Sequence, residues 1–155
     1  MKLNAVETHG DHAETQEFTG RGVVPGRVTA AALVSNEPIS GWGGIDPVKG
    51  TIIEARHELQ GVCFTDKALI FPSAKGSSGW SGFFQSTRLL GTAPAALVFN
   101  TLSTKAVLGA VVTRVPAVAE LDRDPVAGVR TGDTVEVDGD TGTVRILIRA
   151  PQSQR

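Results

Sequence analysis

Two short runs of uninterrupted apolar residues constrain the fold of this chain more than any other feature. Residues 68–71 spell ALIF, and residues 93–100 spell APAALVFN. Such a run is typical of a strand covered on both faces, because a strand with one solvated face alternates apolar and polar residues. An amphipathic helix is expected after the first run, within residues 75–90, and a short helix in residues 103–109. The pattern therefore predicts a β-rich α/β domain.

The second of these helices is expected to begin at Ser103 or Thr104, which are good N-caps, and to stop at Gly109. Residues 109–116, GAVVTRVP, then predict another buried strand that ends at a proline.

Antiparallel hairpins are predicted at both ends of the domain. Residues 129–148 hold two alternating segments, DTVEVD and GTVRILI, with Gly139–Gly142 as the turn between them. Near the amino end, residues 22–35 predict two strands interrupted by the turn pair Pro25-Gly26.

Length and composition favour one domain with a flexible arm before it. A chain of 155 residues fits a single domain, which we assign to residues 19–150. Residues 1–18 are polar and aperiodic, and predict a flexible arm whose His9 and His12 are solvated. The net charge of −1 argues against nucleic-acid or anionic-membrane partners. With no signal-peptide pattern and no apolar stretch of about 20 residues, a cytoplasmic protein is expected.

A single cysteine limits the redox and metal chemistry available to the chain. Cys63 cannot form an internal disulfide, and by itself cannot hold an iron–sulfur cluster or a structural zinc. Its place in the apolar triplet VCF predicts a buried side chain. His57 falls in a predicted strand, where a structural histidine is the default interpretation.

The segment Lys75-Gly76-Ser77-Ser78-Gly79 is the first candidate for chemistry. It joins an apolar strand to a helix, whose first N–H groups are unpaired and attract a carboxylate or a phosphate. The same field would stabilise a serine alkoxide, and the glycines let a substrate approach the backbone. An ordinary serine N-cap is the alternative. The segment is neither a nucleotide-binding P-loop nor a G-x-S-x-G elbow.

The segment Ser40-Gly41-Trp42-Gly43-Gly44 is the second candidate. Three glycines around one tryptophan suit a tightly bent backbone that presents an apolar plate to a ligand or partner. An aromatic plug over one end of the sheet is the alternative. We expect Ser40, Trp42, Gly43 and Gly44 to contribute to substrate binding, together with Lys75, Gly76 and Ser78 from the first segment.

The order of these elements resembles the swivelling β/β/α domain of aconitases and isopropylmalate isomerases. In that superfamily a serine of the Gly-Ser-Ser loop is the catalytic base, which corresponds to Ser77 here. The Arg-Glu that usually follows the serines is absent, and Gly79-Trp80 stand instead. This departure weighs against aconitase and isopropylmalate isomerase themselves, because their arginine binds the substrate carboxylate.

A tighter resemblance is to the small subunit of aconitase X enzymes, over about residues 20–148. It is carried by five segments: ALVS at 32–35, EPIS at 37–40, WGGIDP at 42–47, KGSSG at 75–79 and APAA at 93–96. The resemblance implies a heteromeric hydro-lyase, inactive without its large subunit. That partner would hold an iron–sulfur cluster and most substrate contacts, while Ser77 removes the proton from carbon.

The resemblance leaves two substrates open, because known members dehydrate cis-3-hydroxy-L-proline or mevalonate 5-phosphate. The few cations near Ser77, Lys75 and at most Arg88, favour cis-3-hydroxy-L-proline as the small hydroxy acid. Mevalonate 5-phosphate is the alternative, and an isomerase of the isopropylmalate type is less favoured. A non-catalytic carrier or interaction domain on the same scaffold, with His57 as the phosphate carrier, is a further alternative.

Overall fold

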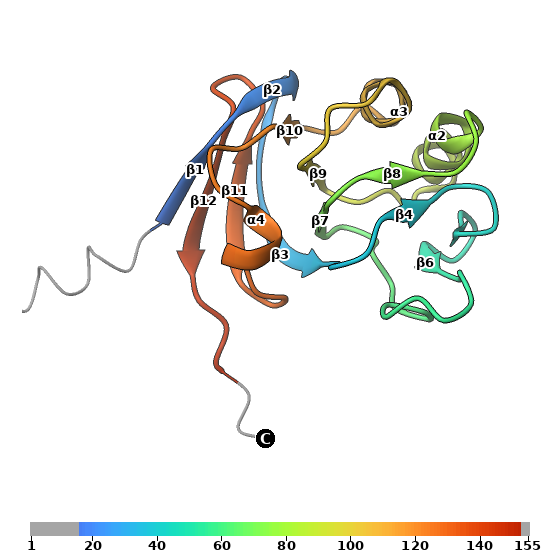
Figure 1. The fold of residues 1–155 in the computed structure, drawn as a ribbon, viewed down its shortest axis with the longest axis horizontal. Helices are drawn as coiled ribbons and strands as arrows, with labels where there is room; N and C mark the ends of the chain where they lie inside the picture. The colour runs from blue at the N-terminus through green and yellow to red at the C-terminus, as the bar shows by residue number, and fades with distance from the viewer. Residues whose placement is uncertain (1–15, 153–155) are drawn as a thin grey trace, which may run out of the picture.

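The computed structural model describes residues 16–152, which fold around one eight-stranded sheet (Figure 1). The strand order is β1-β12-β11-β3-β7-β9-β10-β2. The sheet strands are β1 (Gln16–Thr19), β2 (Arg21–Val24), β3 (Arg27–Val34), β7 (Ala68–Phe71), β9 (Ala96–Phe99), β10 (Ala117–Ala119), β11 (Thr134–Asp138) and β12 (Thr143–Ile148). Two small ladders pair β4 (Ile39–Ser40) with β8 (Ala74–Lys75), and β5 (Ile45–Asp46) with β6 (Thr51–Ile52). The helices are α2 (Trp80–Leu90), α3 (Thr104–Thr113) and α4 (Pro125–Gly128).

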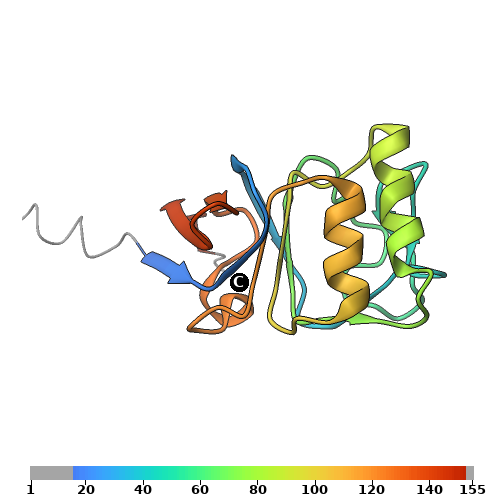
Figure 2. The same ribbon diagram turned by 90° about the horizontal axis from the view of Figure 1, so that it is seen from above.

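The centre of the sheet is parallel and is buried on both faces, as the apolar runs predict. β3, β7, β9 and β10 pair in parallel, and every residue of β7 and β9 is buried. Helices α2 and α3 lie side by side on one face (Figure 2). On that face Phe71 and Phe99 pack with Trp80. On the other face Ile70 and Val98 pack against the antiparallel strands β11 and β12.

The antiparallel half of the sheet curls back toward the strand at the opposite edge. The Gly20 N–H donates to the Gly142 carbonyl at 2.7 Å, and the Gly139 N–H donates to the Gly26 carbonyl at 2.7 Å. A Cβ at Gly139 would lie 1.7 Å from the Val24 carbonyl oxygen, so only glycine fits this crossing. The predicted carboxy-terminal hairpin is confirmed as β11 and β12, with Gly139–Gly142 as its turn.

The two amino-terminal strands form where expected but do not pair with each other. β2 pairs with β10, whereas β3 pairs with β11 and β7, so the predicted amino-terminal hairpin is wrong. Gly26 between them has φ of 119°, which sends the chain from one edge of the sheet to its middle.

The predicted strand at residues 109–116 is also wrong, because the strand of this region, β10, begins after Pro116 and does not end there. Helix α3 continues past Gly109 to Thr113, and its left-handed C-cap is Arg114, with φ of 63°. Gly109 is a helix-interior residue because Trp80 lies against it: a Cβ there would be 2.2 Å from the indole Cζ3. In the sequence, a glycine selected by helix packing therefore cannot be distinguished from a glycine that ends a helix.

The sheet begins inside the segment assigned to the arm. Residues 16–18 belong to β1, and Phe18 is fully buried with the guanidinium of Arg123 4.2 Å from its ring centroid. The expectations for His9 and His12 lie outside the described residues. No helix within residues 16–152 has the length and apolarity needed to cross a bilayer.

Candidate functional site

The two loops that the sequence analysis selected meet in the structure. β4 and β8 pair in parallel, with Ile39 opposite Ala74 and Ser40 opposite Lys75. They continue the direction of β3 and β7, so both loops lie beyond the carboxyl ends of parallel strands. That end of an open α/β sheet is where such folds usually bind ligands.

Ser77 lies on the surface directly before the first turn of α2. Its side chain is exposed, and its Oγ accepts a hydrogen bond from the Gly79 N–H at 3.2 Å. Its carbonyl accepts from the Trp80 N–H at 3.2 Å. Gly79 is the residue before α2 and makes no side-chain capping bond, but the Ser77 Oγ bond to the N–H two residues on is the contact that a capping serine makes, so the N-cap interpretation also stands. The Ser77 hydroxyl therefore lies open to a ligand, near the positive end of a helix.

Gly76 requires glycine for two reasons. Its φ is +96°, a conformation that costs other residues energy, and a Cβ there would lie 3.1 Å from Ser40 Oγ. Ser40 and the Ser77 loop are thus brought together. Ser78 is exposed on the same loop.

The tryptophan loop stands beside the serine loop and not beneath it. Trp42 is 73% exposed, and its ring centroid is 5.9 Å from that of Phe83 on α2. A Cβ at Gly79 would be 3.9 Å from Trp42 Cε3, so the indole borders the Ser77 loop. Gly43 has φ of +74° and is exposed, and Gly44 packs on the Ser40 carbonyl. The alternative of an aromatic plug over the sheet does not hold for Trp42.

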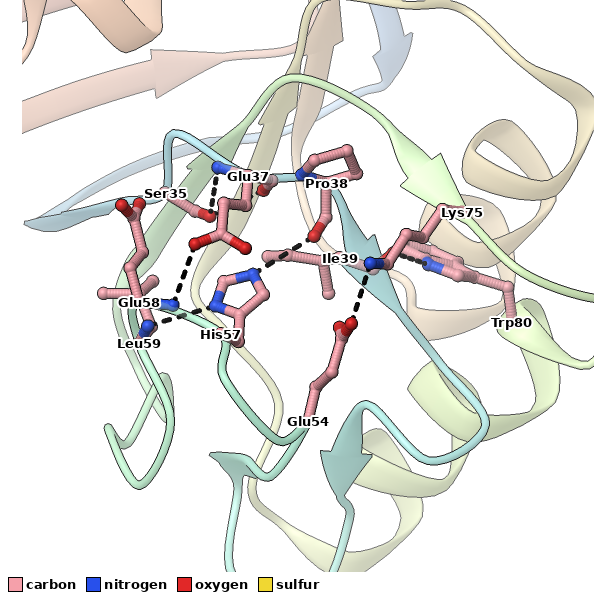
Figure 3. Close-up of polar contacts among 10 residues, drawn as sticks. All are labelled: Ser35, Glu37, Pro38, Ile39, Glu54, His57, Glu58, Leu59, Lys75 and Trp80. Atoms are coloured by element: carbon pink, nitrogen blue, oxygen red, sulfur yellow. Dashed lines mark hydrogen bonds and ion pairs between the residues drawn. The ribbon is translucent and has the colours of Figure 1, made fainter.

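Trp80 fills the buried position instead. Its side chain is fully buried, and its indole Nε1 donates to the Ile39 carbonyl at 2.8 Å (Figure 3). Its ring stacks on Phe84 with the centroids 4.2 Å apart. A Cβ at Gly41 would lie 2.7 Å from Trp80 Cα. Trp80 therefore fixes the start of α2 against β4 and the loop that follows it.

His57 is buried and both of its ring nitrogens are engaged. Nε2 lies 3.1 Å from the Pro38 carbonyl, and Nδ1 accepts from the Leu59 N–H at 3.0 Å (Figure 3). The tautomer that satisfies both contacts carries its proton on Nε2. A histidine with 5% exposure and no free nitrogen cannot carry a phosphoryl group or serve Ser77 as a base. The structural interpretation of His57 holds, although it lies in a turn and not in a strand.

Comparison with known proteins identifies the family. A family model described as the aconitase X swivel domain matches residues 17–146. The chain belongs to the aconitase X swivel domain family. The chain is 38% identical over 130 residues to the phosphomevalonate dehydratase small subunit of Methanocella arvoryzae, covering 84% of this chain and 98% of that protein. It is 36% identical over 127 residues to the subunit of the same name from Thermococcus sibiricus, covering 82% and 95%.

Two solved structures share the fold of this aconitase X swivel domain. The crystal structure of Thermococcus kodakaraensis aconitase X in its holo-form matches with a TM-score of 0.81 and 32% identity, over 85% of this chain and 98% of that one. A solution NMR structure of a UPF0107 protein matches with a TM-score of 0.78 and 34% identity, over 85% and 99%. The resemblance and the fold class expected from the sequence are both confirmed.

The structure places two further charged residues at the serine loop of this swivel domain. Lys75 forms an ion pair with Glu54, with 2.7 Å between Nζ and Oε2, so its ammonium is already engaged (Figure 3). Lys105, from the first turn of α3, donates to the Gly76 carbonyl. Sequence reasoning missed Glu54 and Lys105, because the segment after β6 brings Glu54 to Lys75, and the packing of α2 on α3 brings Lys105 to the loop. Arg88 lies in the last turn of α2, at the helix end away from Ser77.

Cys63 differs from the expectation of a buried hydrophobe, because its thiol is exposed. It faces Thr51 of β6 across an isolated antiparallel bridge. A hydrogen bond from the Thr65 side chain, and then the Thr65 backbone, lowers the pKa of the thiol. Among residues 16–152 no group of three His, Cys, Asp or Glu side chains is placed to hold a metal ion.

Proposed function

We propose that this chain is the small subunit of an aconitase X-type dehydratase, with Ser77 as the base and mevalonate 5-phosphate as the substrate. The observation that carries the proposal is the exposed Ser77 hydroxyl, set before the first turn of α2 on a loop that glycine conformations leave open. The curated relatives described above are small subunits of a dehydratase, which supports a large-subunit partner here.

Ser77 would act by taking the proton from a substrate carbon while the hydroxyl departs from the neighbouring carbon and a double bond forms. The Gly79 N–H and the amino end of α2 would stabilise the deprotonated oxygen, which otherwise forms rarely at neutral pH. An iron–sulfur cluster, which we place in the large subunit, would supply a Lewis acid for the departing hydroxyl. We assign no part in this step to Cys63, the lone cysteine of the chain.

Water exclusion is the part of the reaction that this chain cannot provide alone. Ser77, Ser78 and Trp42 are all exposed in the isolated subunit. A large subunit that covers these residues would strengthen every charge interaction around Ser77 and shield the oxygen from solvent. The proposed enzyme is accordingly inactive until the two subunits meet.

The choice of substrate depends on two opposing observations. The names of the relatives favour mevalonate 5-phosphate. The site favours cis-3-hydroxy-L-proline as a second candidate, because the Glu54 carboxylate neutralises Lys75 and Arg88 lies at the far end of α2. Lys105 is then the one cation at the loop, within residues 16–152, that has no carboxylate partner. A phosphate site normally uses more than one cation, although the large subunit could supply the others.

We place the enzyme in the cytoplasm. The exposed and unpaired Cys63 thiol suits a reducing compartment, because oxidising compartments convert such thiols to disulfides.

The test is reconstitution with the large subunit encoded in the same organism. The complex is incubated separately with mevalonate 5-phosphate and with cis-3-hydroxy-L-proline, and the dehydrated product is followed by mass loss. We expect dehydration of mevalonate 5-phosphate, and Ser77→Ala should reduce kcat by about 10²–10⁴-fold, as loss of a general base does. Ser86→Ala, whose hydroxyl donates to the Gly82 carbonyl within α2, is the matched control and should retain full activity.

Two results would contradict the proposal at different levels. Turnover of cis-3-hydroxy-L-proline alone would exchange the substrate and leave the role of Ser77 in place. An unchanged kcat in Ser77→Ala would remove the base and with it the proposed chemistry.

A further inference from the structure

The Lys105 ammonium lies against the residue that precedes Ser77. Its Nζ donates to the Gly76 carbonyl, across 29 residues of sequence. Lys75, the nearer lysine in sequence, pairs with Glu54. In the part of the chain that the structure describes, none of the ion pairs includes Lys105. Lys105 is therefore the uncompensated positive charge at the serine loop.

The start of α3 is fixed relative to the start of α2. Ser103 caps α3, and its Oγ accepts from the Ala106 N–H at 3.3 Å. One turn after Lys105, on the same helix face, Gly109 packs directly against the ring of Trp80. The backbone N–H of Trp80 in turn donates to the Ser77 carbonyl. Lys105 and Ser77 are thus connected in two ways, directly through Gly76 and indirectly through the contact of Gly109 with Trp80.

Helix stability does not account for a lysine at this position. Lys105 is the second residue of α3, where the helix dipole disfavours a positive charge. The same first turn carries no acidic residue. The bond to the Gly76 carbonyl gives the ammonium a role outside its own helix, at a residue held at φ of +96°.

We infer that Lys105 is a positioning residue for the Ser77 base. By holding the Gly76 carbonyl it keeps the loop in the conformation that presents Ser77 Oγ to the substrate, and its charge stabilises the deprotonated oxygen. No new bond forms in this role, because Ser77 alone takes the proton from carbon. The inference rests on the proposed function, which assigns Ser77 as the base.

The test compares two lysines that make the same kind of contact. Lys67 lies before β7, at the opposite end of that strand from the serine loop, and its Nζ donates to the Cys63 carbonyl at 3.4 Å. We expect Lys105→Met to lower kcat of the reconstituted complex by about 10–100-fold, since one pKa unit of lost stabilisation is a factor of ten in alkoxide. KM should change less than about threefold. Lys67→Met removes the same charge and should retain the full kcat.

The pH profile and a conservative variant separate positioning from general structure. The limb of the pH profile on which kcat rises with pH should move to higher pH in Lys105→Met, because the base would deprotonate less readily. Lys105→Arg should restore most of the lost kcat. A kcat within twofold of the parent with an unmoved limb overturns the inference. A large rise in KM with kcat retained also overturns it, because Lys105 would then bind substrate. Loss of subunit assembly in Lys105→Met would make it an interface residue, with the same consequence.

Amide hydrogen exchange of the small subunit alone gives a readout without turnover. Exchange at Gly76, Ser77 and Gly79 should accelerate in Lys105→Met and not in Lys67→Met, and equal exchange in both variants overturns the inference. The two proposals fail differently. Ser77→Ala with full activity removes the proposed function, whereas an inactive Ser77→Ala beside a fully active Lys105→Met removes only the role of Lys105.

Discussion

Replacing Gly109 with alanine should destabilise the protein, although alanine is the better helix former. The new Cβ would lie 2.2 Å from Trp80 Cζ3 and 2.5 Å from Cε3, whereas carbon atoms in contact are about 3.5–4.0 Å apart. The helices would have to separate by more than an ångström, or the indole would have to turn. Overpacking of this kind costs about 1–3 kcal/mol.

Movement of the indole carries a second cost. Trp80 Nε1 donates to the Ile39 carbonyl at 2.8 Å inside the core, and leaving a buried donor unpaired costs about 1–3 kcal/mol. The gain in helix propensity from glycine to alanine is at most about 1 kcal/mol. We therefore expect a net loss in the free energy of unfolding of about 2–4 kcal/mol.

Gly82→Ala in the neighbouring helix is the matched control. Gly82 is exposed in α2, and nothing lies within 4 Å of its ideal Cβ, so the same substitution should stabilise by about 0.5–1 kcal/mol. Urea unfolding of the isolated subunit measures both, and each kcal/mol should shift Tm by about 3–4 °C in a domain of this size. If Gly109→Ala proves as stable as the parent, the contact with Trp80 does not fix the spacing of α2 and α3.

Two further predictions concern His57 and Cys63. His57→Ala leaves the Leu59 N–H and the Pro38 carbonyl without their partner, so it should cost about 2–4 kcal/mol in urea unfolding while kcat per assembled complex is retained; a kcat loss as large as that of Ser77→Ala would contradict a structural role. The hydrogen bonds from Thr65 lower the pKa of Cys63, so its thiolate fraction at a given pH exceeds that of the unfolded chain. Its alkylation rate by iodoacetamide, followed against pH, should therefore rise at lower pH in the folded protein than in urea, and coincident profiles would exclude the effect.

The sheet was predictable where one segment carries its own signal. The runs at 68–71 and 96–99 are apolar without interruption because helices cover one face of β7 and β9 and other strands cover the other. The carboxy-terminal hairpin was equally clear, since its turn lies between two alternating strands. In each of these elements, the pattern of a few consecutive residues indicates which faces are buried.

The wrong secondary-structure predictions arose where a residue is selected by contacts with segments distant in the sequence. Gly109 has the character of a helix end in the sequence, but it is glycine because Trp80, from another helix, occupies the space of its side chain. Pro25-Gly26 resembles a hairpin turn, but the chain leaves it for two different partners, β10 and β11. Tertiary packing decided both cases, and no local pattern records it.

The candidate site shows the same division. The glycines around Ser77 and Trp42 were visible because backbone conformation selects glycine locally. The charges were not, because Glu54 reaches Lys75 from the segment after β6, and Lys105 reaches Gly76 across the contact of α2 with α3. The expectation of Lys75 as a substrate ligand stays a prediction, and the structure adds the Glu54 carboxylate that compensates its charge.

The arrangement also bears on why the chain would work only within a complex. Its core packs both faces of the central strands, yet the Ser77 loop and Trp42 lie outside that core in contact with solvent. An alkoxide beside bulk water gains little from one N–H donor and one ammonium, since charge interactions at an effective dielectric constant of 80 are about a quarter of those at 20. Under the proposed function, the donors that this chain arranges would become effective when the surface of the large subunit removes the water. A rigid core that carries an incomplete, exposed site is what a subunit needs if it is to approach, close over and leave a substrate held elsewhere.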